Sequence, residues 1–332
     1  MDLTFTEEQE LFRKSVREFV TDRVPPDRLA EIADGDEGWD SALWKEAAGL
    51  GLAGSSVPEE QGGAGMGFIE EAIVSEELGR AVFPGPWLGS VILAQPALSS
   101  SPELLRAVAS GERIATYVPA DGKHVADLGA ADLLVVEADS ALVAIEKEQV
   151  DWKILPTVDG TRRLGRVELG SATGARLSGG DEAAVILERI RVRALAALAS
   201  EAAGVAERAL EIATEYAKER EQFGSPIGKY QAVSHELADT FMDVELTKSL
   251  ALWATAAISE DDPDATIAAE TAKAFAADAS VRACERAIQV HGGIGFTWEH
   301  VLHRYYKRAL WIRAFLASGD DLRAQVTSRL LD

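Results

Sequence analysis

Two polar, glycine-containing stretches in the C-terminal half of the chain have residue types that suit a nucleotide. Arg220 carries a planar, permanently charged guanidinium that can grip a phosphate or pyrophosphate through parallel hydrogen bonds. Gly292 and Gly293 lack Cβ atoms, so a backbone can come close to a ligand there. Amides that can bond sugar hydroxyls or base edges accompany both stretches: Gln222, Gln231 and Gln289. Together they predict a site for a polar, nucleotide-like ligand.

A purely structural role explains the same stretches equally well from the residues alone. Gly224-Ser225-Pro226 can end one helix and start the next, because proline is favoured in the first helical turn. Gly292-Gly293 can be a helix C-cap. Residue types by themselves therefore leave a ligand site and a pair of helix breaks both open.

Composition and charge narrow the class of protein. The chain has 332 residues, 47% of them hydrophobic, which is enough to bury a large core in two or three domains. Its 33 Lys and Arg against 55 Asp and Glu give a net charge of -22, which argues against binding nucleic acid or an acidic membrane. A polyanionic ligand would need a local basic patch. Four cations of one helical stretch could supply it, although such a run is more often a solvated face: Arg304, Lys307, Arg308 and Arg313.

Cysteine usage and the start of the chain predict a cytoplasmic protein. Cys284 is the single cysteine, fits a reducing compartment and lies in an apolar helical pattern typical of a core. The start Met1-Asp2-Leu3-Thr4 is unlike the basic start of a signal peptide. No segment reaches the about 18 uninterrupted apolar residues of a membrane span. The histidines share no metal-ligand spacing with a cysteine or a carboxylate pair, so we expect no metal.

Hydrophobic periodicity predicts an α+β fold in three domains. Residues 1–112 read as helices, beginning with a capping box of Thr6 and Gln9, and residues 193–332 read as a four-helix bundle. Residues 113–192 read as a small β-domain. The strands expected there are Ile114–Val118, Leu133–Val136, Leu142–Ile145, Trp152–Leu155, Val167–Leu169 and Ala183–Leu187.

Two apolar stripes of the bundle are expected to be core. The first begins near Ala194, where the helical period returns, and the second follows the Gly224-Ser225-Pro226 turn. Their members are Leu198, Ala202, Val205, Ala209, Ile212 and Tyr216 in the first, and Tyr230, Val233, Leu237, Phe241 and Val244 in the second.

The two C-terminal stretches resemble a known signature. Residues 220–231 read Arg-x-Gln-Phe-Gly-x-x-Ile-x-x-x-Gln, and residues 289–296 read Gln-x-x-Gly-Gly-x-Gly-Phe. This pair is similar to the C-terminal signature of the acyl-CoA dehydrogenases, whose N-terminal Pro-Glu-x-x-Gly-Gly-x-Gly loop also occurs at residues 58–65. The resemblance implies FAD as cofactor, an acyl-CoA substrate oxidised at its Cα–Cβ bond, and an electron-transfer flavoprotein or similar acceptor.

The resemblance also implies roles for individual residues. In that family these elements reach across an interface to the ADP part of the FAD that a neighbouring subunit holds. Arg220 would bind its pyrophosphate, and Gln222 and Phe223 would contact its adenosine part. Gln231 would reach the adenine end, and the residues that close on the ADP moiety would be Gln289, Gly292 and Gly293.

The chain departs from the family at the catalytic base, which is a glutamate in active members. Ser318 occupies its usual place, and the alternative place near Ala194 offers no carboxylate either. A serine without an activating base cannot take the substrate α-proton near neutral pH. Three acids are nearest, each more readily a helix-terminus or surface charge than a relocated base: Asp320, Asp321 and Glu201.

The flavin-ring half of the site departs as well. No Thr-Glu-Pro loop is present, and Thr116-Tyr117-Val118-Pro119 runs almost directly into Asp121-Gly122. The chain therefore resembles the short, non-catalytic subunit of the heterotetrameric, α2β2 acyl-CoA dehydrogenases that actinobacteria use on steroid side-chain CoA thioesters. A catalytic partner would supply the ring pocket and the glutamate. Two alternatives stay open: a self-sufficient homo-oligomer with Asp320 as relocated base, and a structural subunit that binds no flavin.

Overall fold

The computed structural model describes residues 4–331, so the Met1-Asp2-Leu3 start lies outside the described residues. Two compact units make up the chain. A helical unit comprises residues 1–30, 72–83 and 195–332, and a mixed unit comprises residues 31–71 and 84–194. The sequence-based boundaries at residues 112 and 192 stay a prediction.

The helical unit begins with α1 (Glu7–Arg23), which starts as predicted. The Thr6 hydroxyl accepts the Gln9 backbone N–H at 3.2 Å, and the Gln9 side chain accepts the Thr6 N–H at 3.0 Å, which completes a capping box. One face of α1 is buried through Val16, Phe19 and Val20. Helix α1 is therefore fixed both at its start and along its apolar face.

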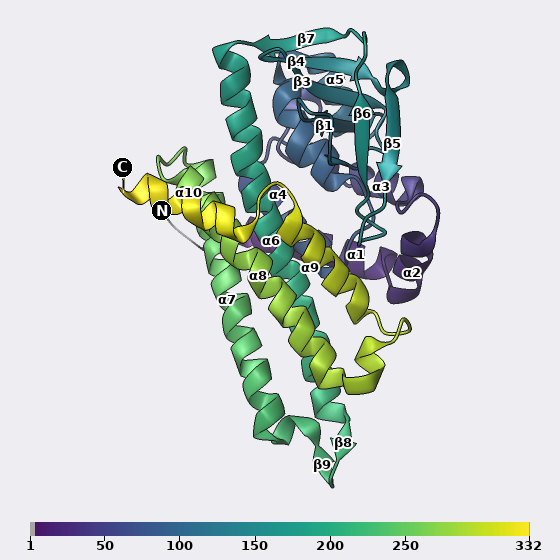
Figure 1. Ribbon diagram of the computed structural model, residues 1–332, viewed down its shortest axis with the longest axis vertical. Helices are drawn as coiled ribbons and strands as arrows, with labels where there is room; N and C mark the ends of the chain where they lie inside the picture. The colour runs from purple at the N-terminus through teal and green to yellow at the C-terminus, as the bar shows by residue number, and fades with distance from the viewer. Residues whose placement is uncertain (1–3, 332) are drawn as a thin grey trace. The chain divides into compact units, whose positions relative to one another are not determined.

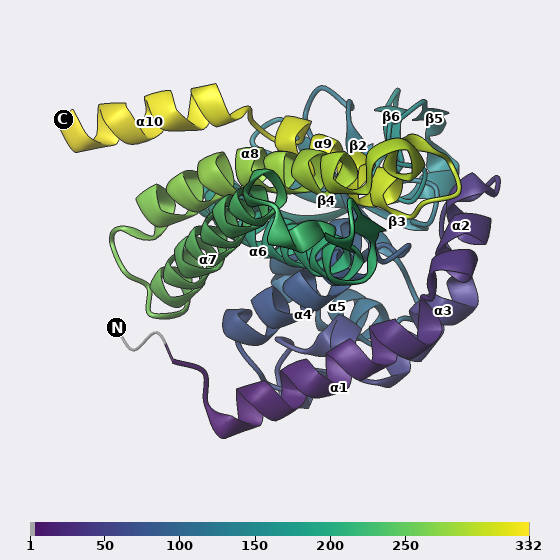
Figure 2. The same cartoon turned by 90° about the horizontal axis from the view of Figure 1, so that it is seen from below.

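Long helices form the bundle of the helical unit, as the periodicity predicts. Figure 1 shows α6, α7 and α8 lying lengthwise beside one another. In Figure 2 α10 lies above α8, to which Arg323 and Arg329 join it through Asp278 and Glu270. Small side chains make close packing possible, with Ala206, Val244 and Ala283 forming a buried cluster. Bundle helices are α6 (Asp181–Glu219), α7 (Gln231–Ser259), α8 (Ala265–His291), α9 (Leu302–Ala314) and α10 (Gly319–Leu331).

Two glycines let α4 (Phe68–Arg80) and α6 touch through their backbones. A Cβ added to Gly204 would lie 1.9 Å from the carbonyl oxygen of Glu76, and one added to Gly79 would lie 2.2 Å from that of Glu201. Both distances are far shorter than real Cβ contacts, so no other residue fits the crossing without a shift. Close backbone contact here brings the charged side chains of the two helices together.

The mixed unit contains two small sheets. The first has strand order β1-β3-β4-β7, with β1 parallel to β3 and the other pairs antiparallel. The second is antiparallel with order β2-β6-β5. The strands are β1 (Ala115–Val118), β2 (Val125–Ala126), β3 (Leu133–Ala138), β4 (Ala141–Glu146), β5 (Asp151–Leu155), β6 (Leu164–Glu168) and β7 (Ala175–Gly179). Five of the six strands expected from the sequence are found.

Shorter helices complete the fold. They connect the longer elements of the chain. The α-helices are α2 (Pro26–Asp34), α3 (Ser41–Gly49) and α5 (Pro102–Ala109). Leu88–Ala94 is a π-helix. The 3₁₀ helices are Leu52–Gly54, Glu59–Gln61, Gln95–Ser100, Lys147–Gln149, Ile227–Lys229 and Gly292–Phe296.

The predicted strand Ala183–Leu187 is wrong, because these residues belong to α6. Helix α6 starts at Asp181, well before the expected start near Ala194. Ala183 and Ile190 are buried at helical spacing, and an apolar run of five residues does not distinguish a strand from a helix. The strands β2 and β7 were not expected, since β2 has two residues and β7 exposes its first two.

A tight turn stands between β1 and β2, where the sequence lacks the longer loop. The Gly122 N–H donates to the Pro119 carbonyl at 2.8 Å, and the Val167 N–H donates to the Gly122 carbonyl at 2.8 Å. The turn is therefore tied to β6. It leaves no extended loop at this edge of the mixed unit.

Candidate functional site

The Arg220 stretch forms a small hairpin at one end of the bundle (Figure 1). Strand β8 (Glu221–Gln222) pairs with β9 (Ser225–Pro226), and the Ile227 N–H donates to the Arg220 carbonyl at 2.8 Å. Phe223 and Gly224 form the tip with φ of 53° and 82°. The Tyr230 hydroxyl donates to the Gln222 carbonyl at 2.9 Å, so the turn is braced although it projects into solvent.

The polar side chains of this stretch are available to a ligand. Arg220 is exposed, and within residues 4–331 its guanidinium makes no ion pair and no side-chain hydrogen bond. Gln231 and Gln289 are exposed as well, whereas the Gln222 amide donates to the Glu221 carbonyl at 2.7 Å. In a chain with 55 acidic residues, a guanidinium left without a carboxylate is suited to an external phosphate.

The second stretch leaves α8 through a conformation that only glycine adopts easily. Gly292 has φ 63° and ψ -135°, and a Cβ added to Gly292 or Gly293 would meet no atom within 4 Å. Gly295 differs, since its added Cβ would lie 2.6 Å from the Ile288 carbonyl oxygen. Gly295 is needed for internal packing. Gly292 and Gly293 instead present open backbone to the outside, which fits close approach by a nucleotide.

A stack of three rings links the two stretches. The Tyr216 ring of α6 lies 4.2 Å from that of His291, the last residue of α8, and His300 lies 4.4 Å from His291 on its way to α9. Burial lowers the pKa of both imidazoles below the usual range. The stack holds the ends of α6 and α8 together, so both stretches lie at the same end of the bundle (Figure 1).

Ser318, at the expected base position, has a structural partner. Its hydroxyl donates to the Asp321 carboxylate at 2.6 Å and accepts the Asp321 N–H at 3.2 Å. This is the geometry of a residue that caps the start of α10. Asp320 has a side chain 93% exposed and pairs with Arg323 at 2.8 Å. Neither residue is placed like a desolvated general base.

Glu201 is not the surface or helix-terminus charge that the sequence suggested. It lies within α6, is 4% exposed, and its carboxylate accepts a hydrogen bond from the Arg308 guanidinium at 2.5 Å. Arg308 has no exposed surface, so the basic run of α9 does not form one continuous patch. Lys307 also lies over the Trp298 ring, at 4.3 Å. Long-range packing therefore buries Arg308 in an ion pair, whereas Lys307 has a local contact with an exposed ring.

Large apolar side chains are exposed where the sequence predicted core. Tyr230 is 37% exposed and Phe241 56%, whereas Val244 of the same stripe is buried. The outer face of α7 adds Met242 and Leu246, which are 61% and 51% exposed. At the hairpin end, Phe223 is 95% exposed, Phe296 76% and Trp298 77%. Exposed apolar patches of this kind mark interaction surfaces, and periodicity alone could not reveal them.

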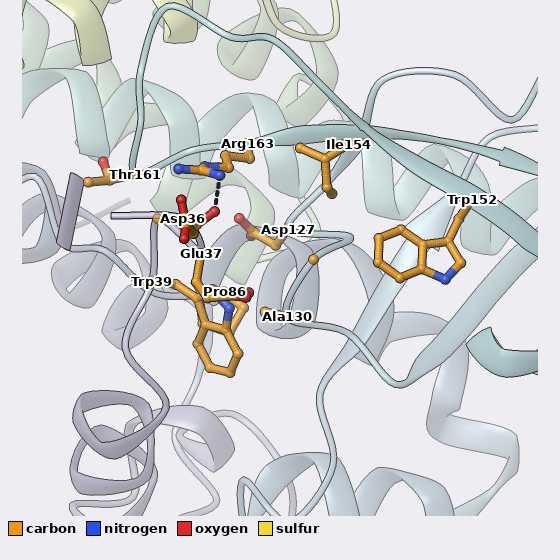
Figure 3. Close-up of a pocket in the computed structure, with 12 residues that line it drawn as sticks. Asp36, Glu37, Trp39, Pro86, Asp127, Ala130, Trp152, Ile154, Thr161 and Arg163 are labelled. Carbon is orange, nitrogen blue, oxygen red and sulfur yellow. Dashed lines mark hydrogen bonds between the residues drawn. The ribbon is translucent and has the colours of Figure 1, made fainter. Parts of the chain in front are cut away.

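A separate pocket lies in the mixed unit and contains none of the predicted site residues. It has a volume of about 250 Å³ and is lined by Trp39, Asp127 and Arg163 among others. Figure 3 shows Arg163 turned toward the Asp36 loop, where it donates to the Asp36 and Gly35 carbonyls. Most small-molecule pockets have volumes of roughly 300–1,000 Å³, so we assign no ligand here.

Neither a metal-binding cluster nor a membrane-spanning helix is found among the described residues. Within residues 4–331, no group of three or more His, Cys, Asp or Glu side chains is placed to hold a metal ion. Along the same range, no helix has the length and apolarity that crossing a membrane requires. Cys284 is fully buried as expected.

Comparisons with known proteins agree with the resemblance. Residues 6–112 match the acyl-CoA dehydrogenase N-terminal domain, and residues 184–331 match the acyl-CoA dehydrogenase C-terminal domain. The acyl-CoA dehydrogenase IpdE2 of Mycobacterium tuberculosis is 34% identical over 99% of both chains. A chain of the ChsE4-ChsE5 complex of Mycobacterium tuberculosis superposes with a TM-score of 0.90, at 28% identity and covering 100% of this chain and 99% of that one. The Tcur3481-Tcur3483 steroid ACAD G363A variant gives 0.88, at 28% identity over 98% of both.

Proposed function

The chain belongs to the acyl-CoA dehydrogenase family, an FAD-dependent family of oxidoreductases, and we propose that it is one subunit of a two-protein enzyme that oxidises the CoA thioester of a steroid side chain. One observation supports the proposal: Arg220 and the Gly292-Gly293 backbone are open to a ligand, while Ser318, where the resemblance expects the base, caps a helix. A chain that has the nucleotide-binding elements but lacks the base needs a partner subunit to complete the active site. We place it with a catalytic subunit in an α2β2 assembly.

Each residue of the nucleotide half-site has a role that its geometry allows. When bound, FAD accepts the β-hydride of the substrate, and the α-proton must go to a base. In this chain the exposed Arg220 guanidinium would bind the FAD pyrophosphate, and the braced Gln222-Phe223 tip would contact the adenosine. The residues that complete the nucleotide contacts are Gln231, Gln289, Gly292 and Gly293.

No proton leaves the substrate through this chain. Ser318 is hydrogen-bonded to Asp321, and Asp320 is exposed beside Arg323, so neither is shielded from water as a tuned base must be. Glu201 is buried in an ion pair with Arg308. The glutamate and the ring pocket therefore come from the partner, which fits the tight turn that follows β1.

The outer face of α7 indicates what the partner presents. Phe241, Met242 and Leu246 form an exposed apolar stripe, and Asp239 and Glu245 are exposed beside it. A second copy of this chain would bring the same carboxylates and another net charge of -22 to the interface. A different subunit with an apolar face and a Lys/Arg rim suits the stripe better.

Two features of the proposal take their support from relatives. The ChsE4-ChsE5 structure is a complex of two proteins, and the Tcur3481-Tcur3483 structure is a steroid acyl-CoA dehydrogenase. Both cover nearly this whole chain. They favour a steroid acyl group and a heteromeric assembly, with an electron-transfer flavoprotein or a similar acceptor for the electrons.

The visible absorption spectrum tests the proposal. The chain should be colourless alone and should yield a yellow complex when it is co-expressed with the partner acyl-CoA dehydrogenase. A yellow single chain that an acyl-CoA bleaches would overturn the partner dependence, and Asp320→Asn in that chain would test the relocated base. A colourless complex would favour a structural subunit.

Arg220→Ala locates the nucleotide contact. Loss of a hydrogen-bonded charge pair costs about 1.5–3 kcal/mol, which corresponds to roughly 10- to 150-fold weaker FAD binding by the complex. Arg313→Ala is the matched control, since Arg313 is also exposed on the bundle. Equal FAD content in both variants would show that Arg220 does not bind the cofactor.

A further inference from the structure

We propose that His300 is a positioning residue for the nucleotide turn, that it clamps His291 against Tyr216, and that protonation of this imidazole pair opens the clamp. The inference rests on the proposed function in one respect, because it takes FAD to be the ligand of the Gly292-Gly293 turn. It assigns His291 and His300 a role in setting the direction in which the chain leaves α8.

The clamp is built from three separate segments. The Tyr216 and His291 rings are stacked, with 4.2 Å between their centroids and 21° between their planes. The His300 ring also contacts His291, with 4.4 Å between the centroids and 55° between the planes. His291 is only 5% exposed, and the next residue is Gly292. A ring at the last helical position that contacts both Tyr216 and His300 fixes where the following glycines begin.

Hydrogen bonds give each imidazole a defined proton. His291 Nδ1 lies 2.7 Å from the Ala287 carbonyl oxygen, and because a carbonyl only accepts, Nδ1 carries the proton in this contact. His300 Nδ1 accepts the Leu302 N–H at 3.3 Å, so in the neutral ring its proton is on Nε2. Protonation of His300 at Nδ1 would remove this acceptor from the start of α9.

Within residues 4–331, the groups in contact with His291 carry no negative charge. The groups that face His291 are the Tyr216 ring from α6, the Ala287 carbonyl from α8 and His300 from the segment before α9. The acids close in sequence are exposed, and within residues 4–331 no carboxylate hydrogen-bonds to either imidazole. These exposed acids are Glu215, Glu219, Glu285 and Glu299, while Arg286 pairs with Glu236 and Asp243.

The balance of effects favours the neutral pair. Burial lowers the pKa of His291 more than its hydrogen bond to the Ala287 carbonyl raises it. Burial lowers the pKa of His300 too, with the neighbouring His291 as the second cause. Each folded-state pKa lies below the unfolded value, so the stabilisation is present above about pH 6.5 and is lost as the pH falls through the lowered values.

The test measures FAD release from the purified complex by flavin fluorescence between about pH 7.5 and pH 5, within the range where imidazole titrates. In the wild-type complex we expect FAD to be released progressively as the pH falls over this interval, because protonation of the imidazole pair opens the clamp. His300→Phe keeps a ring without a proton and should retain FAD at the acid end. His235→Gln, which changes an exposed histidine of α7, should follow the wild type.

Each outcome separates the clamp from the proposed function. A wild-type complex without FAD at pH 7.5 would overturn the proposed function itself. A complex that binds FAD with the same pH profile in His300→Phe and wild type would overturn the clamp alone. Should His300→Phe not assemble, His291→Phe provides the same comparison, because it also removes one titrating ring of the stack. An unchanged acid-side loss of FAD in that variant would refute the inference.

Discussion

Arg308→Met should be among the most destabilising single substitutions in the bundle. Arg308 has no exposed side-chain surface, Glu201 is 4% exposed, and a hydrogen bond of 2.5 Å joins them between α9 and α6. Removing only the cation leaves a carboxylate in the interior without that partner. Breaking a buried pair in this way costs about 3–5 kcal/mol.

A second substitution should recover most of this loss. In Glu201→Met/Arg308→Met both charges are replaced by flexible apolar side chains, and replacing a whole buried pair is often neutral or stabilising by about 1–4 kcal/mol. The exposed-pair control is Arg323→Met, since Arg323 and Asp320 have side chains 52% and 93% exposed. That control should cost about 0–1 kcal/mol.

Urea denaturation followed by circular dichroism measures all three variants against the wild type. The reasoning predicts a large loss for Arg308→Met, a small loss for Arg323→Met, and a double variant that lies nearer the wild type than Arg308→Met does. If Arg308→Met cost no more than Arg323→Met, the Glu201 carboxylate would not depend on this pair. Glu201 would then return as a candidate for the catalytic base.

Three further predictions follow from burial and close packing. Gly204→Ala should destabilise the chain by about 1–3 kcal/mol, because the new Cβ would lie 1.9 Å from the Glu76 carbonyl oxygen. In Gly49→Ala the new Cβ would meet no atom within 4 Å, so the free energy of unfolding should change by no more than about 0.5 kcal/mol. Thermal unfolding measures both variants. Burial lowers the pKa of Lys273 from 10.5 to about 8, so the unfolding free energy should rise by about 3 kcal/mol between these pH values. Lys273→Met should abolish that rise in urea titrations at each pH. Cys284, whose pKa burial raises, should resist iodoacetamide in the folded chain and react in urea; equal labelling in both states, detected by mass spectrometry, would contradict its burial.

Local residue identity is the basis on which we predict the nucleotide elements and the missing base. Arg220, Gly292 and Gly293 belong to motifs whose members are fixed by their spacing along the chain, and Ser318 is visibly not a carboxylate. The helices of the bundle were equally accessible, because a 3.6-residue apolar period over many turns is hard to mistake. The same reasoning failed for Ala183–Leu187, where five apolar residues are too few to show their period.

Tertiary structure decided which of these side chains are buried and what they touch. The run that contains Arg308 is predicted to be a solvated face, yet Arg308 is buried and pairs with Glu201, which lies 107 residues away in the chain. Phe241 is predicted to be core but is 56% exposed. The His291–His300 pair likewise needs α6, α8 and the segment before α9 to converge. The sequence by itself determined the family and the helical bundle, because these depend on residue identity and local period, and it predicts the absence of the catalytic glutamate. Burial, pairing and the ring stack depend on packing between distant segments, which only the folded chain defines.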